Sequence, residues 1–240
     1  MKTSRVACLL PIIMCVAVYS VAAEDQPAHD AVRPVPRQGG WMKRHESFNQ
    51  RVAQGKTDVI FIGDSITQGW EGKGKQVWAK FYQDRNAVNL GIGGDRTQHV
   101  IWRLDNGNLK GIQPKAAVIM IGTNNSGSNS PSQIADGVTT IVKQLRAKLP
   151  ETKILLLAIF PRGTNKSDKR RQVNEATNAM IAKLDDGKHV HYLDIGPKFL
   201  QEDGTLTREI MPDLLHLSPQ GYTIWAESIE GPLAKLLGEK

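Results

Sequence analysis

The sequence has 240 residues and a mass of 26.5 kDa, a size that fits one sizeable domain or two small ones at most. With 40% hydrophobic and 23% charged residues, it excludes a disordered, collagen-like or coiled-coil chain. Its formal net charge of +7 would suit a nucleic-acid binder, but net charge speaks to non-specific attraction rather than to fold.

The start of the chain has the pattern of a secretory signal. Lys2 and Arg5 precede an apolar run over residues 6–21, and small residues follow as far as Ala23. A basic start, a short apolar stretch and a small-residue exit are typical of a cleaved signal peptide. A membrane anchor is the alternative, but a proline interrupts the run, which is shorter than the ~20 apolar residues of a span. We therefore predict a signal peptide over residues 1–23 and a secreted or periplasmic protein.

Both cysteines, Cys8 and Cys15, lie in this segment, so a mature chain of residues 24–240 would contain none. Its formal charge would be +5 once Lys2 and Arg5 are removed. A cysteine nucleophile and a thiolate metal site are thereby excluded, and any metal would need His and carboxylate ligands. An exported protein without disulfides depends on its core for stability.

The mature sequence divides at Trp41. Residues 24–40 are rich in Pro and Gly, which predicts an extended, flexible linker, and a single domain is expected over residues 41–240. Within that domain, short apolar runs rich in β-branched residues are nearly continuous, as in parallel strands buried on both faces. These predicted strands cover residues 58–63, 87–91, 116–122, 153–159 and 190–194.

Helical periodicity separates the strands. Ser130 and Pro131 open one helix with a cap and a first-turn proline, and Ser218 and Pro219 open the last helix in the same way. A further helical pattern covers residues 173–184. Strands that alternate with helices predict a doubly wound α/β sandwich.

Polar segments with small residues stand where such a sheet places its sites. Three follow predicted strands and the fourth precedes the last helix, at residues 63–67, 91–95, 122–125 and 213–216. Because ligands bind beyond the carboxyl ends of the strands in open α/β sheets, we expect these segments to meet there.

Ser65 is the candidate nucleophile. A serine hydroxyl needs a base, which His216 can supply, while Asp213 can hold the imidazole in the productive tautomer. Acyl transfer also needs donors for an oxyanion, and the N–H groups of Ser65 and Gly94 and the side chain of Asn124 are candidates. The alternatives are a helix N-cap for Ser65, a surface loop for His216, and turn residues for Gly94 and Asn124.

Together these segments resemble the four motif blocks of the GDSL/SGNH hydrolase superfamily. The resemblance is carried by Gly63-Asp64-Ser65-Ile66, Gly94, Gly122-Thr123-Asn124, Asp213 and His216. Over roughly residues 41–236 the chain looks like the catalytic subunits of intracellular platelet-activating factor acetylhydrolase, type Ib. That likeness is densest in residues 89–104, 122–125, 161–163, 171–175 and 213–218.

The resemblance implies a flavodoxin-like three-layer sandwich with a five-stranded parallel sheet, the SGNH hydrolase fold. It also implies a serine esterase without metal or cofactor, with Ser65, Gly94, Asn124 and His216 as signature residues and Asp213 completing a triad. With the predicted export, the expected activity is hydrolysis of short-chain, acetyl esters through an acyl-enzyme, on an O-acetylated carbohydrate.

Two other functions remain open. One is a lipolytic enzyme of the lipid acetylhydrolase or lysophospholipase type, and the other is a non-catalytic carbohydrate- or partner-binding domain on a hydrolase scaffold. The expected partner is a small-molecule or glycan ester, with no nucleic acid and no stable membrane insertion. Assembly into a homodimer is left open.

Further residues are candidates for supporting roles. Asp64 and Arg162 are candidates for substrate binding or support, and a loop-fixing ion pair is an equal interpretation of Arg162. Asp95 either orients active-site groups or caps the helix that follows it. On that helix, the spacing predicts Trp102 in the core and Arg103 at the surface or an interface.

Other motifs indicate no further site. Residues 69–75 match most of a phosphate-binding loop, but a glutamine follows where Ser or Thr is needed. A dinucleotide fingerprint begins at Gly91, but Arg96 occupies the place of its third glycine. The pair of histidines in residues 189–191 lacks an obvious third metal ligand. The one dense basic run, residues 166–171, has no interleaved aromatic residues for nucleic-acid binding.

Overall fold

A computed structural model describes Met1 and residues 29–239, so the predicted signal peptide lies outside the described residues beyond Met1. Five parallel strands form one sheet in the order β2-β1-β3-β4-β5, which is the flavodoxin-like order. They are β1 (Val59–Gly63), β2 (Ala87–Gly91), β3 (Ala116–Met120), β4 (Lys153–Leu157) and β5 (Val190–Leu193). All five predicted strands are confirmed, although β3 and β4 end two residues earlier than expected.

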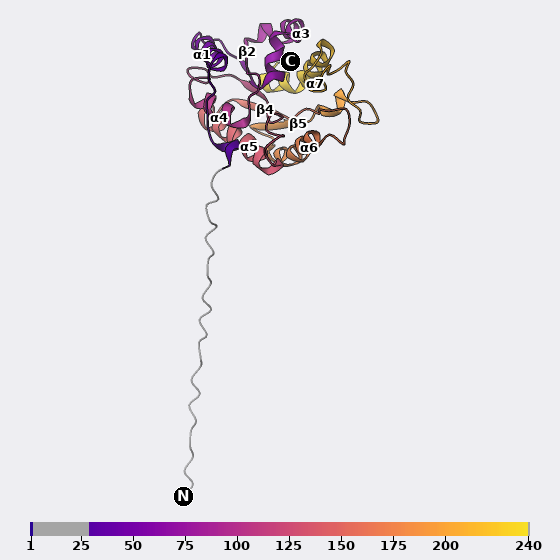
Figure 1. Cartoon of the computed structure of the whole chain (residues 1–240). Helices are drawn as coiled ribbons and strands as arrows, with labels where there is room; N and C mark the ends of the chain where they lie inside the picture. Colours follow the sequence, from indigo (N-terminus) through magenta and orange to yellow (C-terminus); the bar gives the residue numbers. More distant parts are fainter. Residues whose placement is uncertain (2–28, 240) are drawn as a thin grey trace.

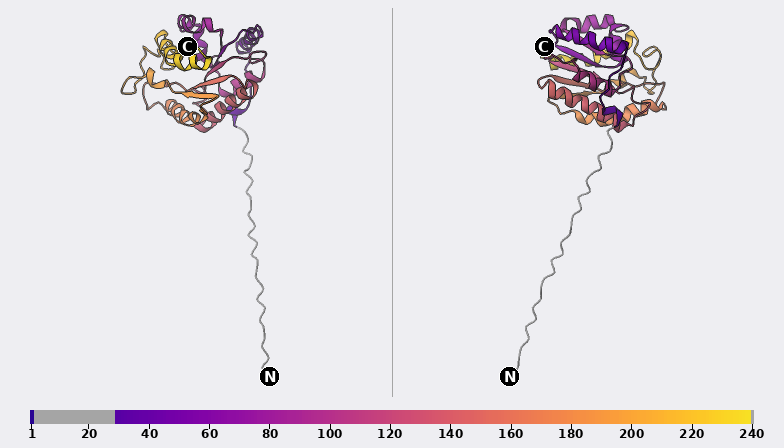
Figure 2. Two further views of the ribbon diagram at one scale, coloured as in Figure 1. Left: turned by 180° about the vertical axis from the view of Figure 1, so that it is seen from behind. Right: turned by 60° about the vertical axis from the view of Figure 1, so that its left-hand side comes forward.

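Helices cover both faces of this sheet and make the three layers seen in Figure 1 and, from other sides, in Figure 2. They are α1 (Gly40–Ala53), α2 (Ser65–Gln68), α3 (Lys75–Phe81), α4 (Thr97–Asp105), α5 (Pro131–Lys148), α6 (Lys169–Ile181) and α7 (Pro219–Leu237). The serines predicted to cap α5 and α7 do so, since each hydroxyl accepts a backbone N–H of the first turn. Within residues 29–239, no helix is both long enough and apolar enough to cross a bilayer.

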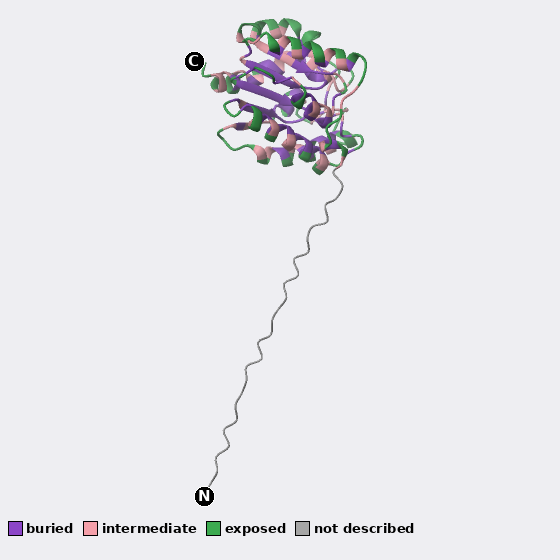
Figure 3. Ribbon diagram, turned by 90° about the vertical axis from the view of Figure 1, so that its left-hand side faces the viewer, coloured by how far each residue is buried: buried purple, intermediate pink, exposed green. Residues whose placement is uncertain are grey.

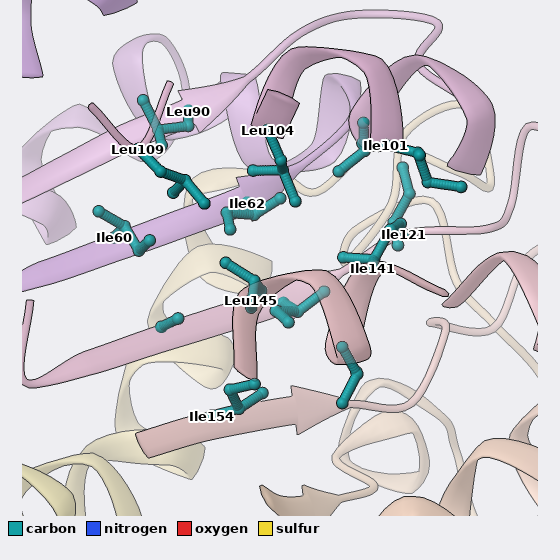
Figure 4. Close-up of a cluster of buried hydrophobic side chains, with 14 of the residues drawn as sticks. Ile60, Ile62, Leu90, Ile101, Leu104, Leu109, Ile121, Ile141, Leu145 and Ile154 are labelled. Carbon is teal, nitrogen blue, oxygen red and sulfur yellow. The ribbon is translucent and has the colours of Figure 1, made fainter. Parts of the chain in front are cut away.

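Each face of the sheet packs into a hydrophobic core of its own. Successive strand side chains point to opposite faces, so Ile60 and Ile62 join one core while Val59 and Phe61 join the other. The first core is closed mainly by α1, α4 and α5, and Figure 4 shows its isoleucines and leucines meeting between strands and helices. The second is closed by α3 and α7. The central strands β1 and β3 are buried throughout, the edge strands β2 and β5 are partly accessible, and exposed residues lie on the outer faces of the helices (Figure 3).

Residues 29–39, which we term the N-terminal strap, lie against the domain and precede α1. Ala31 is fully buried, and its carbonyl accepts a hydrogen bond from Thr97 Oγ1 at 2.7 Å. Farther along, the Val35 N–H donates to the Gln98 carbonyl at 3.4 Å. Over residues 29–39 the structure therefore differs from the flexible linker expected over residues 24–40, of which residues 24–28 lie outside the described part of the chain. Pro and Gly indicate that a segment lacks regular structure, but they do not prevent it from bonding to a neighbouring helix.

Candidate active site

The nucleophile candidate stands where β1 ends. Ser65 is the first residue of α2, and Asp64 is the N-cap, with its Oδ1 accepting the Ile66 N–H at 2.9 Å. The alternative role of Ser65 as an N-cap is therefore excluded. The side chain of Ser65 is free to face the carboxyl edge of the sheet.

Ser65, His216 and Asp213 form a continuous hydrogen-bonded relay. Ser65 Oγ lies 2.9 Å from His216 Nε2, and His216 Nδ1 lies 2.6 Å from Asp213 Oδ2. With the Nδ1 proton donated to Asp213, Nε2 carries the lone pair that can accept the hydroxyl proton. This is the geometry that activates a serine for attack on a carbonyl.

Asp213 also shapes the loop that carries the histidine. Its second oxygen, Oδ1, accepts the backbone N–H groups of Leu215 and His216, at 3.1 and 2.7 Å. Between Asp213 and His216, Leu214 adopts a left-handed φ of 60°. Its carbonyl accepts the Gly163 N–H at 2.9 Å. A single carboxylate therefore fixes both the loop and the imidazole ring.

The electrostatics of Asp213 suit this arrangement. Burial acts to raise the pKa of Asp213, but the hydrogen bonds from the ring and backbone of His216 outweigh it and hold the pKa below its usual value. The carboxylate is thus ionised at neutral pH and can stabilise an imidazolium. The site is open to solvent, because 44% of the His216 side chain and 56% of the Asp213 side chain are exposed.

The three candidate oxyanion donors lie on Ser65 itself, on the turn after β2 and on the loop after β3. A Cβ atom added to Gly93 would lie 3.8 Å from the Cβ of Ser65, which places the turn through Gly94 beside the nucleophile. Within the described part of the chain, the N–H groups of Ser65 and Gly94 have no acceptor. Asn124 Nδ2 donates one hydrogen to the Asp95 carbonyl at 2.9 Å, which leaves its second hydrogen for a ligand. Each of the three candidates therefore has an N–H available for an oxyanion.

Asp95 follows Gly94 and anchors the turn after β2 through its buried side chain. Its carboxylate is fully buried and accepts from Trp41 Nε1 at 2.6 Å and from Arg103 Nε at 2.9 Å. It accepts no backbone N–H of α4, whose N-cap is Arg96, so the alternative of a helix cap is wrong and the orienting role is the one that fits. The predicted surface position of Arg103 is also wrong, because a buried carboxylate requires a buried cation. Trp102 is half-buried and packs against the core, as expected.

Arg162 lies in the loop after β4 and supports the third polar segment. Its Nη1 donates to Thr123 Oγ1 at 3.2 Å, next to Asn124 in the chain. No carboxylate of the described residues lies within 4 Å of its guanidinium, so the alternative of a loop-fixing ion pair is not found. The contact of Arg162 with substrate stays a prediction.

Asp64 is completely buried beside Ser65, and this has a measurable consequence for stability. Burial raises the pKa of its carboxyl to about 7, and its Oδ2 has no hydrogen-bond partner among residues 29–239. Because the folded pKa exceeds that of the unfolded chain, the folded protein binds the additional proton between about pH 4 and pH 7. The contribution of this group to stability is therefore complete at low pH and is lost as pH rises through 7.

We expect Asp64→Asn to remove this pH dependence. The asparagine Oδ1 can still accept the Ile66 N–H, but the amide does not titrate. The free energy of unfolding of the variant minus that of the wild type, from urea titrations, should increase between about pH 4 and pH 7, by ~4 kcal/mol at most. It should be constant at higher pH. A difference independent of pH would show that the Asp64 carboxyl titrates as it does in water.

The site also contains residues for which the sequence carried no signal. Arg37, in the strap, donates from Nη1 to the Gly93 carbonyl at 2.8 Å, and Gln68 Oε1 accepts the Gly93 N–H at 2.7 Å. Trp41 is a further residue of this kind, because its indole N–H donates to the Asp95 carboxylate from a distant part of the sequence. For Arg103, the helical spacing indicated a surface or interface position and not the pairing with Asp95.

Other parts of the molecule offer less for catalysis. Two hollows of about 500 and 850 Å³ lie beside α1, and neither is lined by Ser65. No three His, Cys, Asp or Glu side chains of residues 29–239 are grouped closely enough to hold a metal ion. The basic run at the start of α6 is not wholly solvated, because Arg171 is buried and donates to the Gly204 carbonyl at 3.0 Å.

Comparison with known proteins agrees with this geometry. Residues 61–224 match the model of the GDSL-like lipase/acylhydrolase family. The chain is 36% identical to the human platelet-activating factor acetylhydrolase IB subunit alpha1, over 91% of this chain and 94% of that protein. The fold is shared with a GDSL-like lipase from Bacteroides thetaiotaomicron, with a TM-score of 0.66, 19% identity, and 80% of this chain and 97% of that chain covered. It is also shared with a carbohydrate acetylesterase family member from Sinorhizobium meliloti, with a TM-score of 0.60, 15% identity, and 76% and 99% covered.

Proposed function

Because the chain belongs to the GDSL-like lipase/acylhydrolase family and is a serine hydrolase acting on ester bonds, we propose that it is an exported esterase that removes acetyl groups from carbohydrates. The observation that carries the catalytic assignment is the relay from Ser65 Oγ through His216 to Asp213, with both contacts below 3 Å. A scaffold that had lost its chemistry would have no reason to keep a complete relay.

The proposed mechanism follows from these contacts. His216 Nε2 takes the Ser65 proton as Oγ attacks the ester carbonyl, and Asp213 stabilises the imidazolium that forms. The N–H groups of Ser65 and Gly94 and the amide of Asn124 bind the oxyanion. The imidazolium then protonates the leaving alcohol, which leaves the acyl group on Ser65. Water, deprotonated by His216, releases the acid and restores the hydroxyl.

Three features support an acetylated carbohydrate as substrate. The named relatives and neighbours include acetylhydrolases and acetylesterases, which favours a two-carbon acyl group. The exposed His216 and Asp213 leave room for a large, hydrated alcohol. Apart from Met1, the exposed large hydrophobic side chains of the described residues are only Val35 and Met180, on separate segments. An enzyme that works at a lipid surface needs a contiguous apolar face.

The competing substrate is a lipid. The 36% identity with a platelet-activating factor acetylhydrolase subunit favours a lipid acetyl ester, and it is the observation that keeps this second function open. The two functions share the acetyl group and differ in the alcohol, so the alcohol decides between them.

Substrate profiling tests the proposal. We expect kcat/KM for 4-nitrophenyl acetate to exceed that for the butyrate, and that for the octanoate, by at least about tenfold at each step. Among natural esters, we expect acetate release from acetylated xylo-oligosaccharides and none from an acetylated ether phospholipid presented in vesicles. Preferential release from the lipid would contradict the carbohydrate assignment. A protein inactive on every ester and unlabelled by a fluorophosphonate probe would be a binding domain.

Export is the second part of the proposal. It is supported by the basic start, the apolar run of residues 6–21 and the small residues up to Ala23. N-terminal sequencing of the protein from its native cell should give a chain that starts at Glu24. A chain that retains residues 1–23 would contradict export by cleavage.

A further inference from the structure

The peptide unit between Gly93 and Gly94 is held at its carbonyl end by the N-terminal strap. Arg37 Nη1 donates to the Gly93 carbonyl at 2.8 Å and lies 3.6 Å from Asp95 Oδ1. A Cβ atom added to Gly94 would lie 3.1 Å from the same nitrogen, so the guanidinium lies directly against the turn. The arginine side chain is 40% exposed, while the Asp95 carboxylate is fully buried.

This contact controls the direction of an oxyanion donor. The carbonyl of Gly93 and the N–H of Gly94 belong to one planar trans peptide, so they point in opposite directions. Fixing the oxygen therefore fixes the line along which the Gly94 N–H points. A charged donor on the carbonyl also polarises the peptide and strengthens its N–H as a donor.

Each neighbouring peptide of the turn has a restraint of its own. The Ile92 N–H donates to the Gly63 carbonyl, the Gly93 N–H donates to Gln68 Oε1, and the Asp95 N–H donates to the Ile92 carbonyl. In the described structure, the one side chain that holds the Gly93–Gly94 peptide is Arg37. Because both residues are glycines, with Gly94 at φ 75°, the backbone itself offers little resistance to a flip of this peptide within the turn.

The strap is anchored well enough to present this arginine. Ala31 is buried with its carbonyl on Thr97 Oγ1, and Asn129 Nδ2 donates to Asp30 Oδ1 at 2.5 Å. After Arg37 the chain enters α1 at Gly40, so the segment is held on both sides.

We propose that Arg37 is a positioning residue for the oxyanion hole and that the strap, which precedes the region matched by the family model, is part of the catalytic apparatus. The inference rests on the proposed function, since it assigns a role in stabilising the oxyanion on the Ser65 ester. Arg37 acts through the Gly94 N–H, and it contacts neither Ser65 nor His216.

Kinetics of Arg37→Ala on 4-nitrophenyl acetate test the role. Loss of an oxyanion donor costs about 10²- to 10³-fold in kcat, so a donor that is present but poorly aimed should cost about 10- to 100-fold. KM should stay within about twofold, because the oxyanion forms only in the transition state. Arg37→Lys should fall between the two proteins, since lysine keeps the charge without the planar fork. Added methylguanidine should restore part of the kcat of Arg37→Ala and leave the wild type unchanged.

Arg146→Ala is the matched control. Arg146 also donates to backbone carbonyls, those of Pro150 and Thr152, but it does so before β4, at the opposite end of the sheet. Its kcat should stay within about twofold of the wild type. A kcat for Arg37→Ala equal to that of the control, a change confined to KM, or a loss that methylguanidine does not reverse would overturn the proposal. An inactive wild type would instead contradict the esterase function itself, which separates the two failures.

Discussion

Replacing Ser65 with alanine should reduce kcat toward 4-nitrophenyl acetate by at least about 10⁴-fold, because no other group of the relay can form the acyl-enzyme. What remains should be the modest acceleration that the oxyanion donors give to direct attack by water. The variant should fold normally, since the N-cap of α2 is the Asp64 carboxylate and not the serine. Steady-state kinetics with a thermal melt as a check on folding give the measurement.

A second readout and a control make this result decisive. Intact-mass analysis should show one fluorophosphonate adduct on the wild type and none on Ser65→Ala. Ser47→Ala, which removes a hydroxyl from the outside of α1, should label and turn over like the wild type. Turnover of Ser65→Ala within about tenfold of the wild type would remove Ser65 from the role of nucleophile.

The loss expected for His216→Gln is nearly as large, about 10³- to 10⁵-fold in kcat. Glutamine can hydrogen-bond to the Ser65 hydroxyl but cannot accept its proton. The wild-type rate should also fall as the solution is acidified, because base catalysis requires a neutral imidazole. The residual rate of the variant should lack that acid limb. Rate–pH profiles of the two proteins between about pH 5 and pH 8 provide the comparison.

His191→Gln serves as the control for this variant. His191 lies on β5 and has no contact with the relay, so the replacement should leave the rate and its acid limb intact. If His216→Gln kept the acid limb, another group would have to be the base. If it kept the wild-type rate, the 2.9 Å contact between His216 and Ser65 would be structural only.

The fold was largely predictable because its strands are buried on both sides. Runs such as residues 58–63 are nearly continuous in apolar residues, and only parallel strands between two helical layers require that pattern. The sheet in turn made the site predictable, since the segments after β1, β2 and β3 meet at its carboxyl edge. The hydrogen bonds from Ser65 to His216 and from His216 to Asp213 agree with that expectation.

What could not be predicted depends on contacts between segments far apart in the chain. An arginine at the position of Arg103 on a helix is predicted to lie at the surface. Its burial follows from the buried Asp95 carboxylate with which it pairs, and that pairing is known only from the fold. The strap was predicted to be a linker because its prolines and glycines indicate only the conformation of the local backbone. They carry no information on the helix against which the strap packs. Trp41 and Arg37 acquire their roles only by meeting the turn after β2, some fifty residues away.

The relay also has a consequence for the way the activity is acquired. Ser65 and His216 are 151 positions apart in sequence, and strands β2 to β5 and helices α3 to α6 lie between them. Contacts of such long range form late, after the loop-closure entropy of the intervening chain has been overcome. During renaturation from urea, ester hydrolysis should therefore recover later than the helical circular dichroism signal. The rate at which activity returns would then report the last step of folding.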